Sequence, residues 1–222
     1  MIYDITMPLF PGQLVWPGDP EIEIAPLLSI SSGDPANISL LKFGTHTGTH
    51  IDAPRHMLAD GPGVDQIEPE KLIGPVQVLD ITSSEENLIL PEAIRRAGFC
   101  RTIPRVLFKT GNSQIADDQK FHRTFVSLAR ESAEWLVQEG VFLIGIDYLS
   151  IEAADTSDYG LHRILLSRQV VLVEGLILNS VPAGIYELIC APLKIVQGDG
   201  APARVFLKTL SKRSSIIPSA SG

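Results

Sequence analysis

The sequence predicts a single α/β domain that is rich in β-structure and has few peripheral helices. Three observations lead to this prediction. Short runs rich in Val, Ile and Leu, separated by Pro and Gly, occur along most of the chain, as is typical of strands and turns. Few segments have helical periodicity. The 222 residues, of which 45% are hydrophobic and 20% charged, match one ordinary globular domain.

Strands are the most numerous predicted elements. Each run is short and apolar, and most are bounded by Gly, Pro or polar residues. The predicted strands include Glu21–Ala25, Ile38–Gly44, Pro75–Ile81, Arg105–Thr110, Val141–Asp147, Val170–Glu174, Tyr186–Pro192 and Ala203–Leu207.

Two segments are predicted to be helices. Pro91–Gly98 has Pro at its opening and Gly at its end, and Ser127–Glu139 is closed by Gly140. The segments Leu149–Asp155 and Gly160–Leu166 could each hold a turn or two of helix, but such short apolar patterns fit other structures equally well.

One domain accounts for almost the whole chain. We expect residues 1–210 to form it, and residues 211–222, which are mostly small and polar, to form a flexible C-terminal tail. No internal repeat is found.

Composition argues against several classes of protein. No apolar run reaches the roughly 18 to 20 residues that span a bilayer, and the first ten residues lack the basic segment of a signal peptide, so we expect a cytoplasmic protein without a membrane partner. The formal net charge is −8 and the Lys and Arg residues do not cluster, which argues against nucleic acid as a partner. Cys100 and Cys190 share no metal-type spacing, so we expect two reduced, structural thiols.

The strongest chemical signal is a cluster of histidines. Three of the five histidines, His46, His50 and His56, fall within eleven residues together with Asp52. Imidazole and carboxylate are the ligands that suit zinc and other first-row divalent ions. The cluster therefore predicts a site for a divalent metal.

The residues between these histidines favour an extended chain over a helix. Thr47, Thr49 and Ile51 are β-branched, Gly48 lowers helix propensity by roughly 1 kcal/mol relative to Ala, and Pro54 would interrupt a helix. In a strand, His50 and Asp52 share one face, about 6.6 Å apart along the backbone.

A straight strand would not bring His46 to the same ion. It would lie roughly 13 Å from His50, too far for both rings to reach a metal at about 2.0 to 2.1 Å. We therefore expect the chain to bend at Gly48, the residue type that tolerates such a conformation.

Four further polar or aromatic side chains have both a structural and a functional interpretation. Glu174 ends an apolar run and, if buried, needs a compensating partner such as a metal ion. Asp147 and Asp80 follow similar runs, and there we favour a structural role. Trp16, in a Trp-Pro-Gly-Asp-Pro turn, either packs on the core or forms an aromatic wall of a ligand pocket. Spacing alone does not indicate whether His162 or His122 has a functional role.

The run HTGTHIDAPRH from His46 to His56 resembles the HxGTHxDxPxH signature of the cyclase-like metal-dependent hydrolases, which include bacterial kynurenine formamidase and isatin hydrolase. The resemblance extends to segments across nearly the whole chain before the tail: Trp16–Asp19, Gly145–Asp147, His162, Val173–Gly175 and Pro192–Lys194 through Asp199–Arg204.

The resemblance implies a swivelling β/β/α domain that assembles as a homodimer or homotetramer. It also implies that His46, His50 and Asp52 hold one divalent ion, and that Asp52 shares a second with His162 and Glu174. His56 corresponds to a histidine that transfers protons, and Trp16 to an aromatic residue near the substrate.

The function implied is a metal-dependent amidohydrolase that resembles arylformamidase and acts on a small amide of the N-formylkynurenine type. Water activated by one or two divalent ions, zinc in preference to manganese, would attack the amide carbonyl, and His56 would carry the proton to the leaving nitrogen. A Gly-x-Ser-x-Gly nucleophile elbow is absent, which argues against serine catalysis. Two alternatives stay open: opening of a cyclic amide or lactone, as in isatin hydrolase, and a metal-binding protein without activity.

Overall fold

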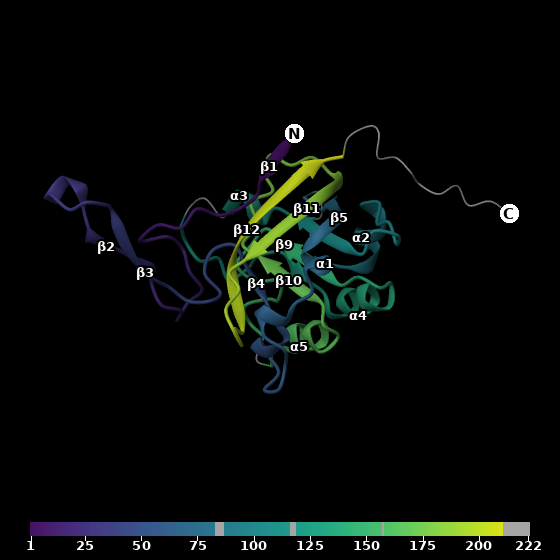
Figure 1. The fold of residues 1–222 in the computed structure, drawn as a ribbon. Coiled ribbons are helices and arrows are strands. Elements are labelled where there is room, and N and C mark those ends of the chain that lie inside the picture. The colour runs from purple at the N-terminus through teal and green to yellow at the C-terminus, as the bar shows by residue number, and fades with distance from the viewer. Residues whose placement is uncertain (83–86, 116–118, 157, 211–222) are drawn as a thin grey trace.

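A computed structural model describes residues 1–82, 87–115, 119–156 and 158–210. The predicted C-terminal tail, 211–222, lies outside the described residues. The described chain is β-rich and forms a single body, drawn as a ribbon in Figure 1.

A mixed sheet that closes on itself forms the centre of the fold. The order of its eight strands is β1 (Ile2–Asp4), β12 (Gly200–Thr209), β11 (Gly184–Pro192), β5 (Ile73–Asp80), β7 (Arg105–Lys109), β9 (Leu143–Ile146), β10 (Val171–Glu174) and β4 (His50–Asp52). Since β4 also pairs with the first part of β12, the strands from β12 to β4 close into a barrel, and β1 continues the same edge of β12. The neighbours β5, β7, β9 and β10 run parallel, and the other pairs are antiparallel.

Helices cover one side of the barrel. The helices of the described residues are α1 (Pro69–Leu72), α2 (Pro91–Arg96), α3 (Asn112–Ile115), α4 (Arg130–Gln138) and α5 (Gly160–Ser167). Figure 1 shows α2, α4 and α5 on the same side of the strands. Since β7, β9 and β10 are buried on both faces, their sequences read as unbroken apolar runs.

Alternate side chains of these strands enter two apolar cores. Leu107, Leu143 and Val173 join the core that fills the barrel, whereas Phe108 and Ile144 join the core beneath the helices. This alternation is the period of two expected of strands. No helix of the described chain has the length and apolarity to cross a membrane.

Two short sheets complete the described strands. β6 (Leu88–Ile89) pairs with β8 (Ser127–Leu128) beside the helices. β2 (Glu23–Leu28) pairs with β3 (Ile38–Lys42) in a hairpin that projects from the barrel, at the left of Figure 1.

Each of the eight predicted strands overlaps an observed one, but some boundaries and elements differ. The predicted helix Ser127–Glu139 begins only at Arg130, because the Ser127 amide donates to the Asn87 carbonyl and pairs β8 with β6. Leu149–Asp155 contains no helix, whereas Gly160–Leu166 forms most of α5.

Candidate active site

The predicted ligands meet on the outer face of the barrel, between β4, β10 and helix α5. His50 lies directly opposite Glu174 in the antiparallel ladder of β4 and β10, and Asp52 follows two residues later on the same face of β4. Ile51, between them, points into the barrel core. Helix α5 brings His162 to the same place. Backbone pairing therefore fixes the relative positions of His50, Asp52 and Glu174.

The bend expected at Gly48 is present. Its φ of +64° lies in the left-handed region, which disfavours side chains that carry a Cβ. The turn returns the chain so that His46 Nδ1 lies 2.8 Å from Asp52 Oδ1. Gly175 also has a positive φ, of +68°, and a Cβ there would collide with the Gly48 carbonyl. Gly48 and Gly175 therefore allow the loop that carries His46 to approach the end of β10 closely.

Hydrogen bonds orient two imidazole rings toward the carboxylates. His50 Nδ1 donates to the Gly48 carbonyl over 3.0 Å, which leaves Nε2 3.5 Å from both Asp52 Oδ1 and Glu174 Oε2. His162 Nδ1 donates to Glu152 Oε2 over 2.6 Å, and its Nε2 lies 3.3 Å from Glu174 Oε1. A fixed Nδ1–H leaves the Nε2 lone pair free to coordinate an ion, as at many histidine metal sites.

Asp52 connects two groups of donors. Its Oδ1 faces His46 and His50, and its Oδ2 lies 3.7 Å from His162 Nε2. The ligand atoms of His46, His50 and Asp52 lie within 4.8 Å of one another, and so do those of Asp52, His162 and Glu174. The arrangement can therefore hold one ion in each group, with Asp52 between them.

The charges of the buried cluster favour a cation. Burial alone would lower the pKa of His50 and of His162, but the carboxylates around them outweigh it and raise both pKa values to about 10. The carboxylates of Asp52 and Glu174 favour the protonated ring at His50, and those of Glu152, Glu174 and Asp52 favour it at His162. A divalent ion can replace those protons, and nitrogen and oxygen donors suit zinc or manganese, so the residues fit such an ion.

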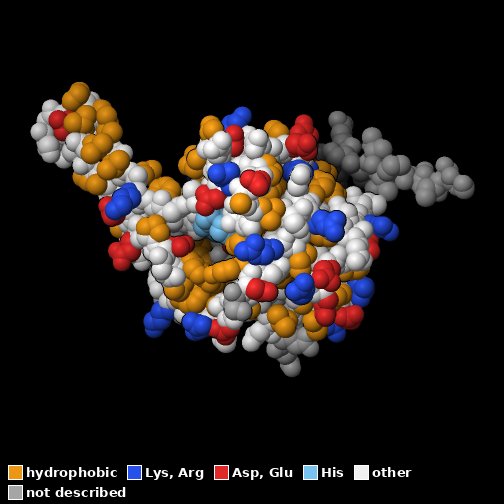
Figure 2. Space-filling model, turned by 90° about the horizontal axis from the view of Figure 1, so that it is seen from below, with side chains coloured by type: hydrophobic (Ala, Val, Ile, Leu, Met, Phe, Trp, Pro, Cys, Tyr) orange, Lys and Arg blue, Asp and Glu red, His pale blue; other side chains and the backbone are white. Residues whose placement is uncertain are grey.

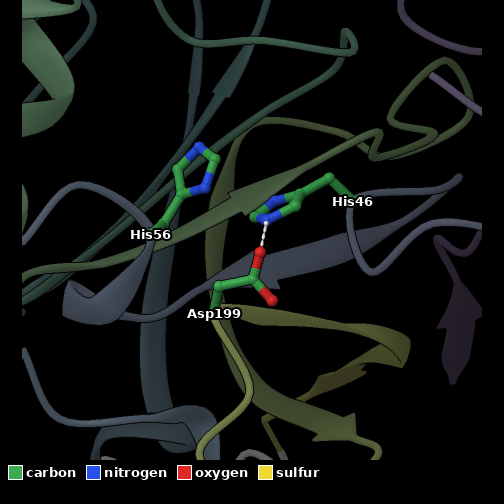
Figure 3. A group of neighbouring side chains, drawn as sticks. All are labelled: His46, His56 and Asp199. Carbon is green, nitrogen blue, oxygen red and sulfur yellow. Dashed lines mark hydrogen bonds and ion pairs between the residues drawn. The ribbon is translucent and has the colours of Figure 1, made fainter. Parts of the chain in front are cut away.

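His56 lies beside this cluster without a hydrogen bond from its ring to another described residue. The His56 and His46 rings are 4.0 Å apart between centroids, and His46 Nε2 lies 3.2 Å from Asp199 Oδ2 (Figure 3). Ligand atoms of these three residues form a third group within 4.8 Å. Burial lowers the pKa of His56, so its ring favours the neutral form that can accept a proton.

A pocket of about 300 Å³ opens over the cluster. His50, His162 and Glu174 line its floor, and Trp16 and Tyr159 line its walls. Trp16 contacts Phe121 edge to face, with ring centroids 4.9 Å apart, so packing holds the indole at the pocket. In Figure 2 histidine side chains are exposed beside hydrophobic ones at a hollow in this face.

Six of the seven predicted site residues line one pocket, and the seventh, Asp52, is buried against three of its histidines. The structure adds two carboxylates that contact the histidine rings. Glu152 accepts from the His162 ring and from the amides of Leu161 and His162, and Asp199 contacts His46. Glu152 falls in the ambiguous segment after β9, where no local pattern marks it. Asp199 belongs to the stretch on which the resemblance rests, but no role was predicted for it.

The carboxylates interpreted as structural have other partners. Asp147 accepts from the Thr110 amide and hydroxyl and from the Ser113 hydroxyl. Asp80 accepts from Thr82. His122 is not among the residues that line the pocket.

The known proteins that resemble this chain include one described as a metal-dependent hydrolase, in agreement with a cluster of residues that can hold metal ions. Residues 3–153 match the family model described as "Putative cyclase". The kynurenine formamidase of Salinibacter ruber (strain DSM 13855 / M31) is 36% identical over 208 residues, which cover 93% of this chain and 97% of that protein. A solved structure described as a predicted metal-dependent hydrolase from Bacillus stearothermophilus has a TM-score of 0.80 at 34% identity and covers 93% of this chain and 97% of that one. Isatin hydrolase A from Labrenzia aggregata has a TM-score of 0.83 at 25% identity, with 95% and 94% covered.

Proposed function

The chain belongs to the putative cyclase family, and from that premise we propose that it is a metal-dependent hydrolase of small aryl formamides of the N-formylkynurenine type. In this reaction water adds to the formyl carbon, the C–N bond breaks, and formate and an aryl amine leave. The observation that carries the proposal is the buried group of histidines and carboxylates at the floor of an open pocket, with His56 beside it. Two relatives described as kynurenine formamidases, 36% and 34% identical to this chain, support the formamide substrate.

We propose that His46, His50 and Asp52 hold one divalent ion and that Asp52, His162 and Glu174 hold a second. Zinc is the ion we propose, with manganese as the alternative. When bound, such an ion supplies Lewis-acid chemistry, which acidifies water and polarises a carbonyl oxygen. The residues themselves contribute prearranged donors, because backbone pairing and the Nδ1 hydrogen bonds fix their positions.

His56 is the proposed proton carrier. Its ring lines the pocket, with its plane tilted by 38° from that of the His46 ring, and makes no hydrogen bond to another described residue that would hold its proton. An imidazole in this place can accept a proton from the attacking water and return it to the amine as the C–N bond breaks. Trp16 provides an aromatic wall against which an aryl ring can pack.

The test combines metal analysis with initial rates on N-formylkynurenine, isatin and a simple lactone. We expect the formamide to be hydrolysed fastest and a chelator to abolish the activity. Preference for isatin would instead favour cyclic amide opening, in line with the structural similarity to isatin hydrolase A. Inactivity of the metal-loaded protein on all three would favour the non-catalytic alternative.

The variant His56→Ala separates catalysis from metal binding. It should lose turnover and keep its metal content, since His56 stands outside both proposed ligand groups. Loss of metal from this variant would contradict the role in proton transfer and favour coordination by His56 together with His46 and Asp199.

A further inference from the structure

Tyr159 has a backbone conformation that is rare for a tyrosine. Its φ of +50° and ψ of 40° lie in the left-handed region, where the Cβ of an ordinary residue crowds the following carbonyl oxygen. Tyr159 is also the residue that caps the start of α5, a position that normally has extended backbone. Such outliers persist only where the surrounding structure holds them, and they concentrate at active sites and ligand-binding segments.

The strained tyrosine lies at the pocket over the histidine cluster. Four described residues other than glycine have a positive φ, namely Gln119, Tyr159, Gln169 and Gln197. Of these four, only Tyr159 is among the residues that line the pocket. The strain at Tyr159 therefore coincides with a place where a ligand can bind.

Hydrogen bonds on both sides of Tyr159 hold its backbone. The Asp158 carboxylate accepts from the Gly160 amide over 3.1 Å, and the Tyr159 carbonyl accepts from the Arg163 amide, also over 3.1 Å. These bonds fix the start of α5 and, with it, the direction in which the tyrosine side chain leaves the backbone.

The Tyr159 ring keeps surface available for a ligand. It is 45% exposed and belongs to none of the three apolar clusters of the described residues. Its centroid lies 6.4 Å from that of the His162 ring, and the two planes are 74° apart. The ring therefore stands beside a proposed metal ligand, at the pocket, without being part of the core.

Trp16 lines the same pocket and is held in a different way. Its indole packs edge to face on Phe121 and Phe125, with ring centroids 4.9 and 6.4 Å away. Packing thus positions Trp16, whereas backbone hydrogen bonds position Tyr159. Because both aromatic side chains are placed in advance, a flat ring that binds between or beside them need not order them.

We propose that Tyr159 is a specificity-determining residue, which selects substrates whose amide nitrogen carries a flat aryl ring over those that carry a saturated ring. Edge-to-face or offset contacts between aromatic rings raise affinity by about 2- to 10-fold beyond the effect of the apolar area that they bury. The inference rests on the proposed function, because it specifies the leaving group of the same reaction.

Binding of two ketones tests this selection without relying on turnover. Acetophenone and cyclohexyl methyl ketone share the same carbonyl group and nearly the same size, and neither contains an amide bond. Isothermal titration calorimetry of the metal-loaded protein should show tighter binding of acetophenone. Tyr159→Leu should reduce this preference by about 2- to 10-fold, whereas Tyr159→Phe, which keeps the ring, should retain it.

Glycine substitutions separate backbone strain from ligand contact. Tyr159→Gly should unfold at a higher urea concentration than the wild type, because the relief of strain exceeds the extra entropy that glycine gives the unfolded chain, and it should lose the preference for acetophenone. Gln169→Gly is the matched control, since Gln169 has a φ of +56° just beyond the other end of α5 and lies outside the pocket. It should gain similar stability and keep the wild-type preference.

Two results would overturn the proposal. One is an equal preference for acetophenone in Tyr159→Leu and the wild type, or no preference in the wild type. The other is a Tyr159→Gly protein that is less stable than the wild type while Gln169→Gly is more stable, which would give the ring a structural role.

Initial rates on formanilide distinguish a failure of this inference from a failure of the proposed function. Tyr159→Leu should raise KM for formanilide more than it lowers kcat, because the ring contacts the leaving group and not the reacting atoms. A wild type that hydrolyses formanilide but binds both ketones equally would refute the inference alone. A wild type that prefers acetophenone but hydrolyses no formamide would refute the proposed function alone.

Discussion

Replacing Glu152 with Gln should weaken metal binding without removing any proposed ligand. The Glu152 carboxylate accepts from His162 Nδ1 over 2.6 Å, and also from the amides of Leu161 and His162 over 3.1 Å each. A Gln amide keeps only one accepting oxygen, and its NH₂ group would face N–H donors. The variant therefore loses at least one charge-assisted hydrogen bond, about 1.5 to 3 kcal/mol in magnitude, from the group that orients the His162 ring.

The expected result is a rise of the metal dissociation constant by about 10- to 100-fold, the usual effect of losing a partner that orients a metal-binding histidine. Competition with a chromophoric chelator measures this constant directly. Asp147→Asn is the matched control, because Asp147 is also buried and accepts several hydrogen bonds, but from Thr110 and Ser113 instead of a histidine. It should lower thermal stability and leave metal affinity unchanged. Equal metal affinities of Glu152→Gln and the wild type would refute this reasoning.

Three other outcomes are expected. Gly48→Ala should lower the free energy of unfolding by roughly 2 to 4 kcal/mol in urea, since a Cβ at φ +64° is strained and meets the Leu9 side chain. Gly98→Ala, at φ +87° with open space around the added Cβ, should lower it only by the roughly 1 to 2 kcal/mol of backbone strain. Equal losses in the two variants would show that the contact with Leu9 is unimportant. Cys190 is buried, which raises the pKa of its thiol to about 12. A thiol reagent should therefore modify only Cys100 in the folded protein, and both cysteines in denaturant. Rapid labelling of both cysteines without denaturant would contradict this burial. Asp52→Ala should release metal from both proposed ligand groups, measured by elemental analysis, and full retention would mean that Asp52 is not a ligand.

Local sequence pattern predicted the barrel strands well where both faces are buried. Runs such as Val141–Asp147 and Val170–Glu174 read as strands because helices cover their outer side, and each contains an observed strand of four residues. The start of α4 was placed too early, because Ser127 pairs with a strand some 40 residues earlier in the chain. No propensity encodes that pairing.

The candidate site likewise has a part that local sequence predicts and a part that depends on contacts between distant segments. The bend at Gly48 follows from residue type and metal-ligand reach, both of which are local. His162 reaches the site only because α5 packs against the barrel. Sequence spacing alone gave no reason to prefer His162 over His122 as a site residue. Glu152 was not predicted, because its partner His162 lies ten residues away on α5, a helix that the sequence pattern did not establish.

Strand β4 has only three residues, yet it is paired along both edges, to β10 and to β12. A slip of one residue would turn Ile51 outward and His50 and Asp52 into the apolar barrel, because neighbouring residues of a strand face opposite sides. A single residue inserted between His50 and Asp52 would therefore turn one of these two side chains into the barrel, while leaving the composition almost unchanged. Changes of chain length during the divergence of such proteins should consequently accumulate in segments such as the β2–β3 hairpin, which projects from the barrel and contributes no strand to it.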